Sequence, residues 1–221
     1  MIRKILIAED HENANISLQK TLTDLAIQDV DIVYYCDDAL RKIEKQYQAN
    51  NSYDLLITDL HFEPDHRAQQ LNSGVELIGA AKKIQPDLKI LVFSAERKPA
   101  TIQMLLQTHE IDGYVPKARH DADELKTAIG KINKNERHLP DQFSVNIRRQ
   151  HLHEFSEYDR TIIALLANGV LQKNIPSYLR QHGIQPAGLS SVEKRLNLIR
   201  ETLKFQKNEQ LVIFCKDMGI I

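Results

Sequence analysis

The segment Ile5-Leu6-Ile7-Ala8-Glu9-Asp10-His11 decides the fold of the first half of the chain, because a short apolar run ends there in an acidic pair. Four more apolar runs of similar length follow it. They are rich in β-branched or aromatic residues, which is typical of strands buried on both faces of a parallel sheet. These runs lie at residues 32–35, 55–57, 90–93 and 113–115.

Amphipathic stretches with helical spacing separate and follow these runs. Pro99 fits the first turn of the fourth helix, and Asp121 or Asp123 fits the N-cap of the fifth. Five alternating strands and helices predict an α/β fold with an open, doubly wound parallel sheet. The apolar positions that mark the five helices are Ile16, Leu18, Leu22 and Leu25; Ala39, Leu40 and Ile43; Leu77, Ile78, Ala81 and Ile84; Ile102, Leu105 and Leu106; and Leu125, Ala128, Ile129 and Ile132.

Polar residues end four of the five apolar runs, and ligands of such sheets bind beyond the carboxyl ends of the strands. The residues are Glu9 and Asp10, then Asp59, Ser94 and Lys117. Three carboxylates at one edge repel one another unless a cation lies among them, and their oxygen ligands suit Mg²⁺. A lysine and a hydroxyl can bind a phosphoryl group, and an aspartate can act as the nucleophile that forms an aspartyl phosphate. The set predicts phosphoryl chemistry.

Other enzyme classes fit these residues less well. Residues 74–82 have the glycine spacing of a nucleotide-binding loop, but they lack the lysine and hydroxyl residue that the loop requires. A phosphate-cleaving enzyme with Asp59 as nucleophile is disfavoured, because His61 stands where a second acid/base carboxylate would be expected. Each candidate residue alone has an ordinary interpretation as a helix cap or a surface group. The prediction rests on their order along the chain.

Residues 1 to about 130 resemble the receiver domain of two-component response regulators. The matching segments are ILIAEDH, LLITDL, ILVFSA and GYVPKA. The resemblance implies a flavodoxin-like strand order, 2-1-3-4-5, and a sensor histidine kinase that donates a phosphoryl group to Asp59. It also implies that the domain catalyses only its own phosphorylation and dephosphorylation.

The same resemblance assigns roles to the remaining site residues. Glu9 and Asp10 would hold Mg²⁺ together with Asp59 and the backbone carbonyl of His61. Lys117 would pair with the phosphoryl group. Ser94 and Tyr114 would take the hydroxyl and aromatic switch positions.

Two features depart from the receiver pattern. Gly74 lies 15 residues after Asp59, further than is usual, so residues 61–73 form a longer polar loop beside the site. His61 and His66 in this loop are expected to be solvated rather than to bind a transition metal. Pro116 precedes Lys117, where the family more often has proline after the lysine, so the resemblance does not predict the local backbone geometry.

The second half predicts a linker and a small helical domain. Residues 134–153 mix charge and polar residues, with a short helical turn expected at 143–148. Four helices follow: residues 157–167, a helix that contains Ile175 and Leu179, residues 191–205, and residues 209–218. The expected caps are Ser156, Asn174 and Asn208 at the starts, and Gly169 and Gly219 after the ends. The predicted domains are therefore 1–133, a linker at 134–153, and 154–221.

This half resembles the LuxR/FixJ-type helix-turn-helix of response regulators. The matching segments are FSEYDRTIIALLANGVLQKNI, SSVEKRLNLIRETL and NEQLVIFCKDMGII. The resemblance implies that the third helix enters the major groove of promoter DNA and that the last helix contributes to a homodimer. The expected DNA contacts are Ser191, Lys194, Arg195, Asn197, Arg200 and Lys204.

Departures from the helix-turn-helix pattern keep a protein-binding output open as the alternative. Eleven residues separate Leu179 from Ser191, a longer turn than is usual. Pro176 costs about 3 kcal/mol inside a helix, so the second helix is expected to start late, with Pro176 in its first turn.

Charge and cysteine content complete the prediction. Residues 1–130 hold 15 basic and 21 acidic residues, whereas residues 131–221 hold 14 and 9, which indicates two domains with different partners. Residues 154–221 carry a net charge of only +2, which is modest for a DNA-binding domain and favours a dimer. Two cysteines, Cys36 and Cys215, indicate the reducing cytosol, and no apolar run approaches the roughly 20 residues of a membrane span. We therefore expect a cytoplasmic transcriptional regulator controlled by phosphorylation.

Overall fold

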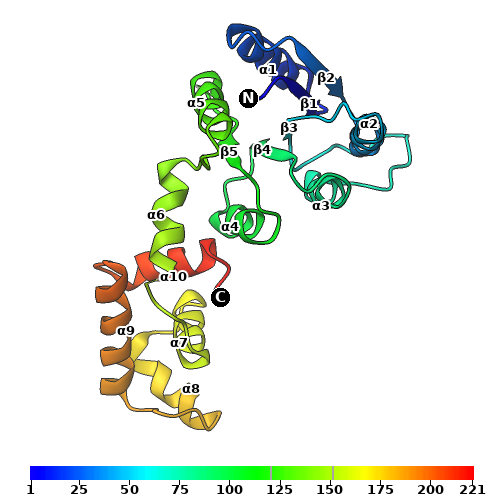
Figure 1. Cartoon of the computed structure of the whole chain (residues 1–221). Helices are drawn as coiled ribbons and strands as arrows, with labels where there is room; N and C mark the ends of the chain where they lie inside the picture. Colours follow the sequence, from blue (N-terminus) through cyan, green and yellow to red (C-terminus); the bar gives the residue numbers. More distant parts are fainter. Residues whose placement is uncertain (120, 151) are drawn as a thin grey trace. The chain divides into compact units, whose positions relative to one another are not determined.

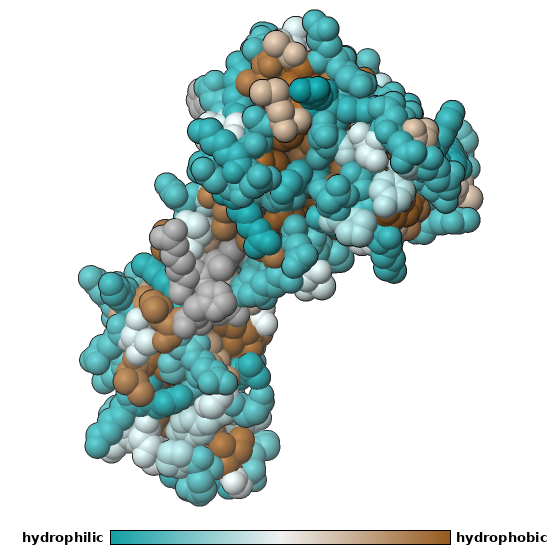
Figure 2. Space-filling model, in the orientation of Figure 1, coloured by the Kyte–Doolittle hydropathy of each residue, from teal (hydrophilic) through white to brown (hydrophobic). Residues whose placement is uncertain are grey.

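The computed structural model describes residues 1–119, 121–150 and 152–221. It divides into two compact units, one of Met1–Arg97 with Thr101–Pro140 and the other of Lys98–Ala100 with Asp141–Ile221. The first unit contains the sheet, and the second is helical (Figure 1). The face shown in Figure 2 is mostly hydrophilic, with scattered hydrophobic residues. Within the described part, every helix is too short or too polar to cross a bilayer.

The first unit contains the predicted five-stranded parallel sheet, and its strand order is β2-β1-β3-β4-β5. The last residues of β1 and β3 are partners in the ladder, as are the last residues of β4 and β5. The order therefore brings the ends of β1, β3 and β4 to adjacent positions in the middle of the carboxyl edge. The strands are β1 (Lys4–Ala8), β2 (Asp29–Val33), β3 (Leu55–Thr58), β4 (Lys89–Ser94) and β5 (Gly113–Pro116).

Helices cover both faces of this sheet (Figure 1). Helices α1 and α5 lie on one face, and α2, α3 and α4 lie on the other. Alternate strand residues such as Ile5, Ile57 and Phe93 point toward the α1–α5 face, where they join Leu18 and Leu125 in one buried cluster. The bounds are α1 (Glu12–Asp24), α2 (Cys36–Gln48), α3 (Gly74–Ile84), α4 (Pro99–Thr108) and α5 (Asp121–Asn133).

Three local predictions in this unit are wrong. Ile16 is 58% exposed, because two residues along a helix correspond to about 200° and place it opposite Leu18. Strand β2 ends at Val33, one residue before the half-exposed Tyr34. Helix α5 begins at Asp121, so Asp121 and Asp123 occupy its first turn rather than its N-cap.

Gly74 begins α3 directly against the end of β3. A Cβ atom at this position would lie 1.8 Å from the carbonyl oxygen of Asp59. The backbone N–H of Gly74 also donates a hydrogen bond to the Leu60 carbonyl at 3.0 Å. The long loop before it is closed at its base by a bridge between His61 and Ser73. The loop can therefore vary in length while the glycine keeps its contact.

The second unit contains the four predicted helices and two elements that were not predicted as such. The expected turn at 143–148 is a ten-residue helix, α6 (Asp141–Gln150), and a short 3-10 helix, η1 (Gln172–Asn174), precedes α8. Asn208 is the first residue of α10 rather than its cap. The other bounds are α7 (Glu157–Ala167), α8 (Ile175–Gln181), α9 (Leu189–Leu203) and α10 (Asn208–Asp217).

The long turn between α8 and α9 packs back onto the unit. The hydroxyl of Tyr158 donates to the Pro186 carbonyl at 2.8 Å, and Arg180 donates to the Ala187 carbonyl at 3.3 Å. Ala187 is 7% exposed and belongs to the core of the unit. The extra residues therefore extend the turn without detaching α9 from the helices that support it.

A buried ion pair fixes α9 to the first turn of α7. Asp159 is fully buried, and its two oxygens accept hydrogen bonds of 2.6 and 2.7 Å from Arg195. Asp159 also accepts from the backbone N–H of Ser156 at 3.0 Å, while the Ser156 hydroxyl caps the helix. Burial alone would raise the pKa of Asp159, but the hydrogen bonds from Arg195 and Ser156 outweigh it and lower the pKa.

We expect Gly74→Ala to destabilise the first unit by about 3 kcal/mol, because its methyl group overlaps a backbone oxygen that cannot move without shifting β3. Gly130→Ala in α5 is the matched control, since its Cβ would meet nothing within 4 Å. Alanine there should be neutral or stabilising by up to about 1 kcal/mol. Urea unfolding, monitored by hydrogen exchange of the strand amides, measures the free energy of unfolding of both variants. Equal stabilities would contradict the contact between position 74 and the Asp59 carbonyl.

We expect Asp159→Asn to destabilise the helical unit by about 3 kcal/mol, since Arg195 then loses its buried partner. Glu157→Gln is the control, because Glu157 is 87% exposed and pairs only at the surface with Arg160. Since the folded-state pKa of Asp159 is lowered, its stabilisation is complete above the ordinary value of 3.8 and is lost as pH falls through the lower folded-state value. The rates of hydrogen exchange of α7 and α9 amides should therefore differ between Asp159→Asn and Glu157→Gln at neutral pH and converge in acid.

Candidate phosphoacceptor site

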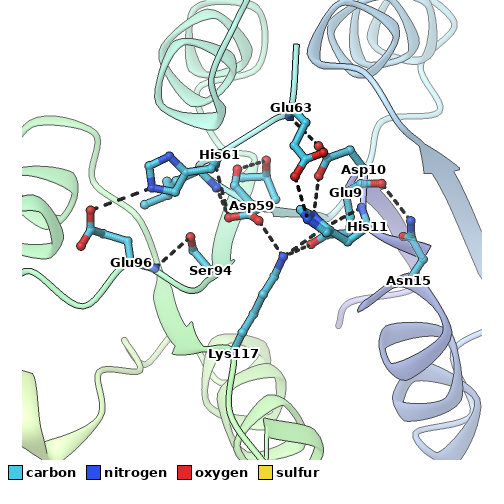
Figure 3. Close-up of polar contacts among 12 residues, drawn as sticks. Glu9, Asp10, His11, Asn15, Asp59, His61, Glu63, Ser94, Glu96 and Lys117 are labelled. Atoms are coloured by element: carbon cyan, nitrogen blue, oxygen red, sulfur yellow. Dashed lines mark hydrogen bonds and ion pairs between the residues drawn. The ribbon is translucent and has the colours of Figure 1, made fainter. Parts of the chain in front are cut away.

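The candidate site lies at the carboxyl edge of the sheet, where the chain leaves β1, β3, β4 and β5 (Figure 3). Glu9 and Asp10 follow β1, and Asp59 follows β3, the neighbouring strand. Ser94 is the last residue of β4, and Lys117 follows β5. The fold therefore brings together the five polar residues that the sequence places at the ends of the strands.

Lys117 links two of the carboxylates. Its Nζ lies 2.6 Å from Asp59 Oδ2 and 2.8 Å from Glu9 Oε2. Asp59 is 4% exposed and Glu9 is 1% exposed, so these charges interact in a poorly hydrated environment. One cation therefore faces two carboxylates, and the cluster retains net negative charge.

The second oxygen of Asp59 is held by the backbone. Oδ1 accepts hydrogen bonds from the N–H of Leu60 at 2.5 Å and from the N–H of His61 at 3.3 Å. The two carboxylate oxygens thus have different environments, one neutral and one beside an ammonium group. Phosphorylation of a carboxylate oxygen here would place the new negative charge close to Lys117.

The cluster has the ligand chemistry of a divalent cation site. Ligand atoms of Glu9, Asp10, His11 and Asp59 lie within 4.8 Å of one another. Glu9 Oε2 and Asp10 Oδ1 are inaccessible to solvent and accept no hydrogen bond of acceptable geometry, although Lys117 Nζ and His11 Nδ1 each lie 2.8 Å away. Buried carboxylate oxygens in this condition fit a hard cation, which prefers oxygen ligands.

The pKa values of neighbouring groups reflect this crowding. Burial raises the pKa of Glu9, and its pairing with Lys117 only partly offsets that shift. Burial would lower the pKa of Lys117, but hydrogen bonds to Asp59 and Glu9 raise it overall. Burial likewise opposes protonation of His11, whose pKa is nevertheless raised by Asp10 and Glu9. The site therefore favours added positive charge.

Ser94 and Tyr114 form a second group beside the carboxylates. Ser94 is fully buried, and its Oγ accepts a hydrogen bond from the N–H of Glu96 at 3.4 Å. Tyr114 is also fully buried, and its hydroxyl donates to the Glu96 carbonyl. Burial raises the pKa of Tyr114, so its hydroxyl is a neutral donor. Glu96, two residues after the end of β4, thus forms hydrogen bonds with both Ser94 and Tyr114.

The structure resolves the two departures noted in the sequence. Pro116 lies opposite Ser94 in the β4–β5 ladder, and the N–H of Lys117 donates to the Ser94 carbonyl at 2.9 Å. Because β5 is an edge strand, a proline is tolerated at its end. His61 places its Nε2 3.9 Å from Glu96, and His66 is exposed. Neither histidine belongs to the metal-capable cluster found among the described residues.

Helix α9 presents fewer free polar side chains than the sequence predicts. Lys194, Asn197 and Lys204 are exposed, with Lys204 as the left-handed C-cap. Arg200 donates to the Gln206 carbonyl at 2.8 Å and to the side chain of Asn197. Arg195, another predicted DNA contact, makes the buried ion pair with Asp159. Ser191 is the third residue of the helix and is half-buried.

Sequence reasoning missed three groups that the structure adds. His11 lies beside Glu9 and Asp10, which its place after the acidic pair could have indicated. Asp159 was recognisable only as the third residue after the Ser156 cap. The backbone N–H of Glu63 donates to Asp10 Oδ2 at 2.7 Å, and nothing in the sequence marks that contact.

Comparisons with known proteins identify the first unit and the overall fold. The family model of the response regulator receiver domain matches residues 5–130. A structure of two RcsB dimers bound to two parallel DNAs is 20% identical, covers 98% of this chain and 99% of its own, and has a TM-score of 0.61. RcsB from Salmonella enterica serovar Typhimurium bound to promoter P1flhDC is 19% identical, with the same coverage and a TM-score of 0.54.

A third similar structure covers the first unit alone. The isolated receiver domain of RcsB from Salmonella enterica serovar Typhimurium, in the presence of phosphomimetic BeF3-, is 23% identical. It covers 65% of this chain and 97% of its own, with a TM-score of 0.53. No curated protein matches this chain. At these identities the structures show a shared fold, and the family model decides the assignment: the chain belongs to the response regulator receiver family.

Proposed function

We propose that this protein is a phosphorylation-dependent response regulator that controls transcription by binding promoter DNA as a dimer in the cytoplasm. The observation that carries the proposal is the 2.6 Å contact between Lys117 Nζ and Asp59 Oδ2 inside a cluster of buried carboxylates. It supports the proposal because a carboxylate oxygen, an ammonium group and a cluster of possible oxygen ligands lie together, as transfer of a phosphoryl group to Asp59 requires.

In this proposal a sensor histidine kinase donates the phosphoryl group, and Asp59 accepts it. Glu9, Asp10 and Asp59 hold Mg²⁺ with the backbone carbonyl of His61 as a further ligand, because hard oxygen donors suit this ion. Bound Mg²⁺ neutralises charge that develops on the phosphoryl oxygens. The domain catalyses its own phosphorylation and dephosphorylation and no other reaction.

Phosphorylation would then act on the group formed by Ser94, Tyr114 and Glu96. The phosphoryl group adds about −1.5 to −2 charge, which Lys117 and the Ser94 hydroxyl would contact. A shift of a two-state equilibrium from 1:99 to 99:1 requires about 5.5 kcal/mol of differential stabilisation. Several charge-assisted hydrogen bonds to one dianion approach that value, so a population shift toward an active state is energetically feasible.

The helical unit would contact DNA through α9. Lys194, Asn197 and Lys204 are exposed on that helix, and Ser191 lies near its start. Arg195 is left out, since its guanidinium is already paired with Asp159. One of the RcsB structures named above contains two dimers bound to two parallel DNAs, and the small net charge of residues 154–221 favours two copies at one operator. A helical unit that binds a protein partner is the alternative.

We expect Asp59→Asn to abolish stable phosphoryl uptake, because the amide cannot act as the nucleophile. Wild-type protein incubated with acetyl phosphate and Mg²⁺ should gain one phosphoryl group per chain, which intact-mass measurement detects. Asp54→Asn is the control, since Asp54 precedes β3 and hydrogen-bonds at the opposite end of the strand. Normal uptake by Asp59→Asn would refute the phosphoacceptor assignment.

We expect Lys194→Ala to weaken binding to a DNA site obtained by unbiased selection and to reduce the salt slope by about one, because one phosphate contact is lost. Lys83→Ala is the control, since it removes the same charge from an exposed position on α3. A salt titration of binding, with and without phosphorylation, measures both. Absence of any sequence preference in the selection would favour the protein-binding alternative.

A further inference from the structure

The loop of residues 61–73 is firmly attached to the start of α2. Arg67 donates two hydrogen bonds to Asp38, at 2.7 and 2.8 Å, and its guanidinium stacks on the Tyr35 ring at 4.3 Å. The Tyr35 hydroxyl donates to Asp65 at 2.6 Å. These contacts join the middle of the loop to residues at the first turn of a helix that lies nearby in the fold but earlier in the chain.

Backbone groups of the loop make the attachment tighter. The N–H groups of Gln70 and Leu71 each donate to the carboxylate of Asp37 at 2.9 Å. The N–H of Asn72 donates to Glu76 in α3 at 2.7 Å. The far part of the loop therefore has a fixed conformation set by two acidic residues of α2 and one of α3, even though most of its side chains are exposed.

The near part of the loop contacts the site itself. The N–H of Glu63 donates a 2.7 Å hydrogen bond to Asp10 Oδ2. The other oxygen, Oδ1, is inaccessible to solvent and lies 2.8 Å from His11 Nδ1. Asp10 is one of the four residues, with Glu9, His11 and Asp59, that offer ligand atoms within 4.8 Å of one another. A hydrogen bond to one oxygen of a carboxylate restricts its rotation, so the loop restricts the orientation of the Asp10 side chain beside the cluster (Figure 3).

We propose that this loop holds Asp10 in the orientation that receives the divalent cation, and that Arg67 is the positioning residue that keeps the loop in place. Arg67 acts through the loop backbone and touches neither the cation nor the phosphoryl group. Partners that orient metal ligands commonly change metal affinity by about 10–100-fold when they are removed. The inference rests on the proposed Mg²⁺ site and extends it to a segment particular to this chain.

The test is calorimetric titration of Mg²⁺ into the full-length protein. We expect Arg67→Ala to weaken Mg²⁺ binding about tenfold. Arg41→Ala is the matched control, because Arg41 pairs with the same carboxylate of Asp38 from within α2 and makes no hydrogen bond or ion pair with the loop among the described residues. It should bind Mg²⁺ within about twofold of wild type. Hydrogen exchange should show faster exchange of the loop amides in Arg67→Ala and unchanged strand amides.

A second pair of variants tests the contact to Asp10 directly. Glu63→Pro removes the donating N–H, whereas Glu63→Ala keeps it and removes a side chain that is 84% exposed and lies 3.8 Å from His11 Nε2. We expect Glu63→Pro to weaken Mg²⁺ binding about fivefold more than Glu63→Ala does. Equal affinities in this pair, or a loosened loop with unchanged Mg²⁺ affinity in Arg67→Ala, would overturn the inference. Failure of wild-type protein to bind Mg²⁺ would instead refute the proposed cation site.

Discussion

Repulsion among buried carboxylates is the constraint on which the site depends. Glu9 and Asp59 are almost fully buried within reach of one ammonium group, Lys117. One cation cannot neutralise them and Asp10 together. Burial raises the pKa of Glu9, with a smaller contribution from the charge of Asp59, and the charges of Asp10 and Glu9 raise the pKa of His11 against the effect of burial. The folded protein therefore holds an electrostatic deficit that a divalent cation would relieve, and the deficit exists only because the sheet order places these residues side by side.

The sequence predicts the fold and the central site because both follow from short-range patterns. Apolar runs and helical spacing predict the parallel sheet, and the carboxyl ends of its strands predict where polar residues meet. Such patterns do not show where side chains obtain partners from distant segments. Arg195 lies on the polar side of its helix by spacing, yet it pairs with Asp159, which is 36 residues away. Periodicity carries no information about such a pair.

The loop of residues 61–73 is a second case in which sequence patterns do not predict contacts with distant segments. Its composition is polar and includes proline, which predicts a loop but not its conformation. The conformation is set by carboxylates of α2, chiefly Asp37 and Asp38, which lie more than twenty residues earlier in the chain. Gly74, by contrast, is recognisable in the sequence by its unusual distance from Asp59. The structure explains why this position is a glycine, because a Cβ atom there would overlap the Asp59 carbonyl oxygen.

The two buried aspartates in the described part of the chain, Asp59 and Asp159, differ in the partners that surround them, and this difference separates a structural role from a chemical one. Asp159 accepts two hydrogen bonds from Arg195 and one from Ser156, and His153 lies 3.3 Å away. Such a carboxylate has no capacity left for a ligand, so it fixes helices. Around Asp59, Glu9 Oε2 and Asp10 Oδ1 are buried, and each has only one basic neighbour at 2.8 Å among the described residues, Lys117 and His11 respectively. Buried negative charge that is only partly compensated is costly to keep, and its persistence at this edge of the sheet is the strongest physical argument for a cation site there.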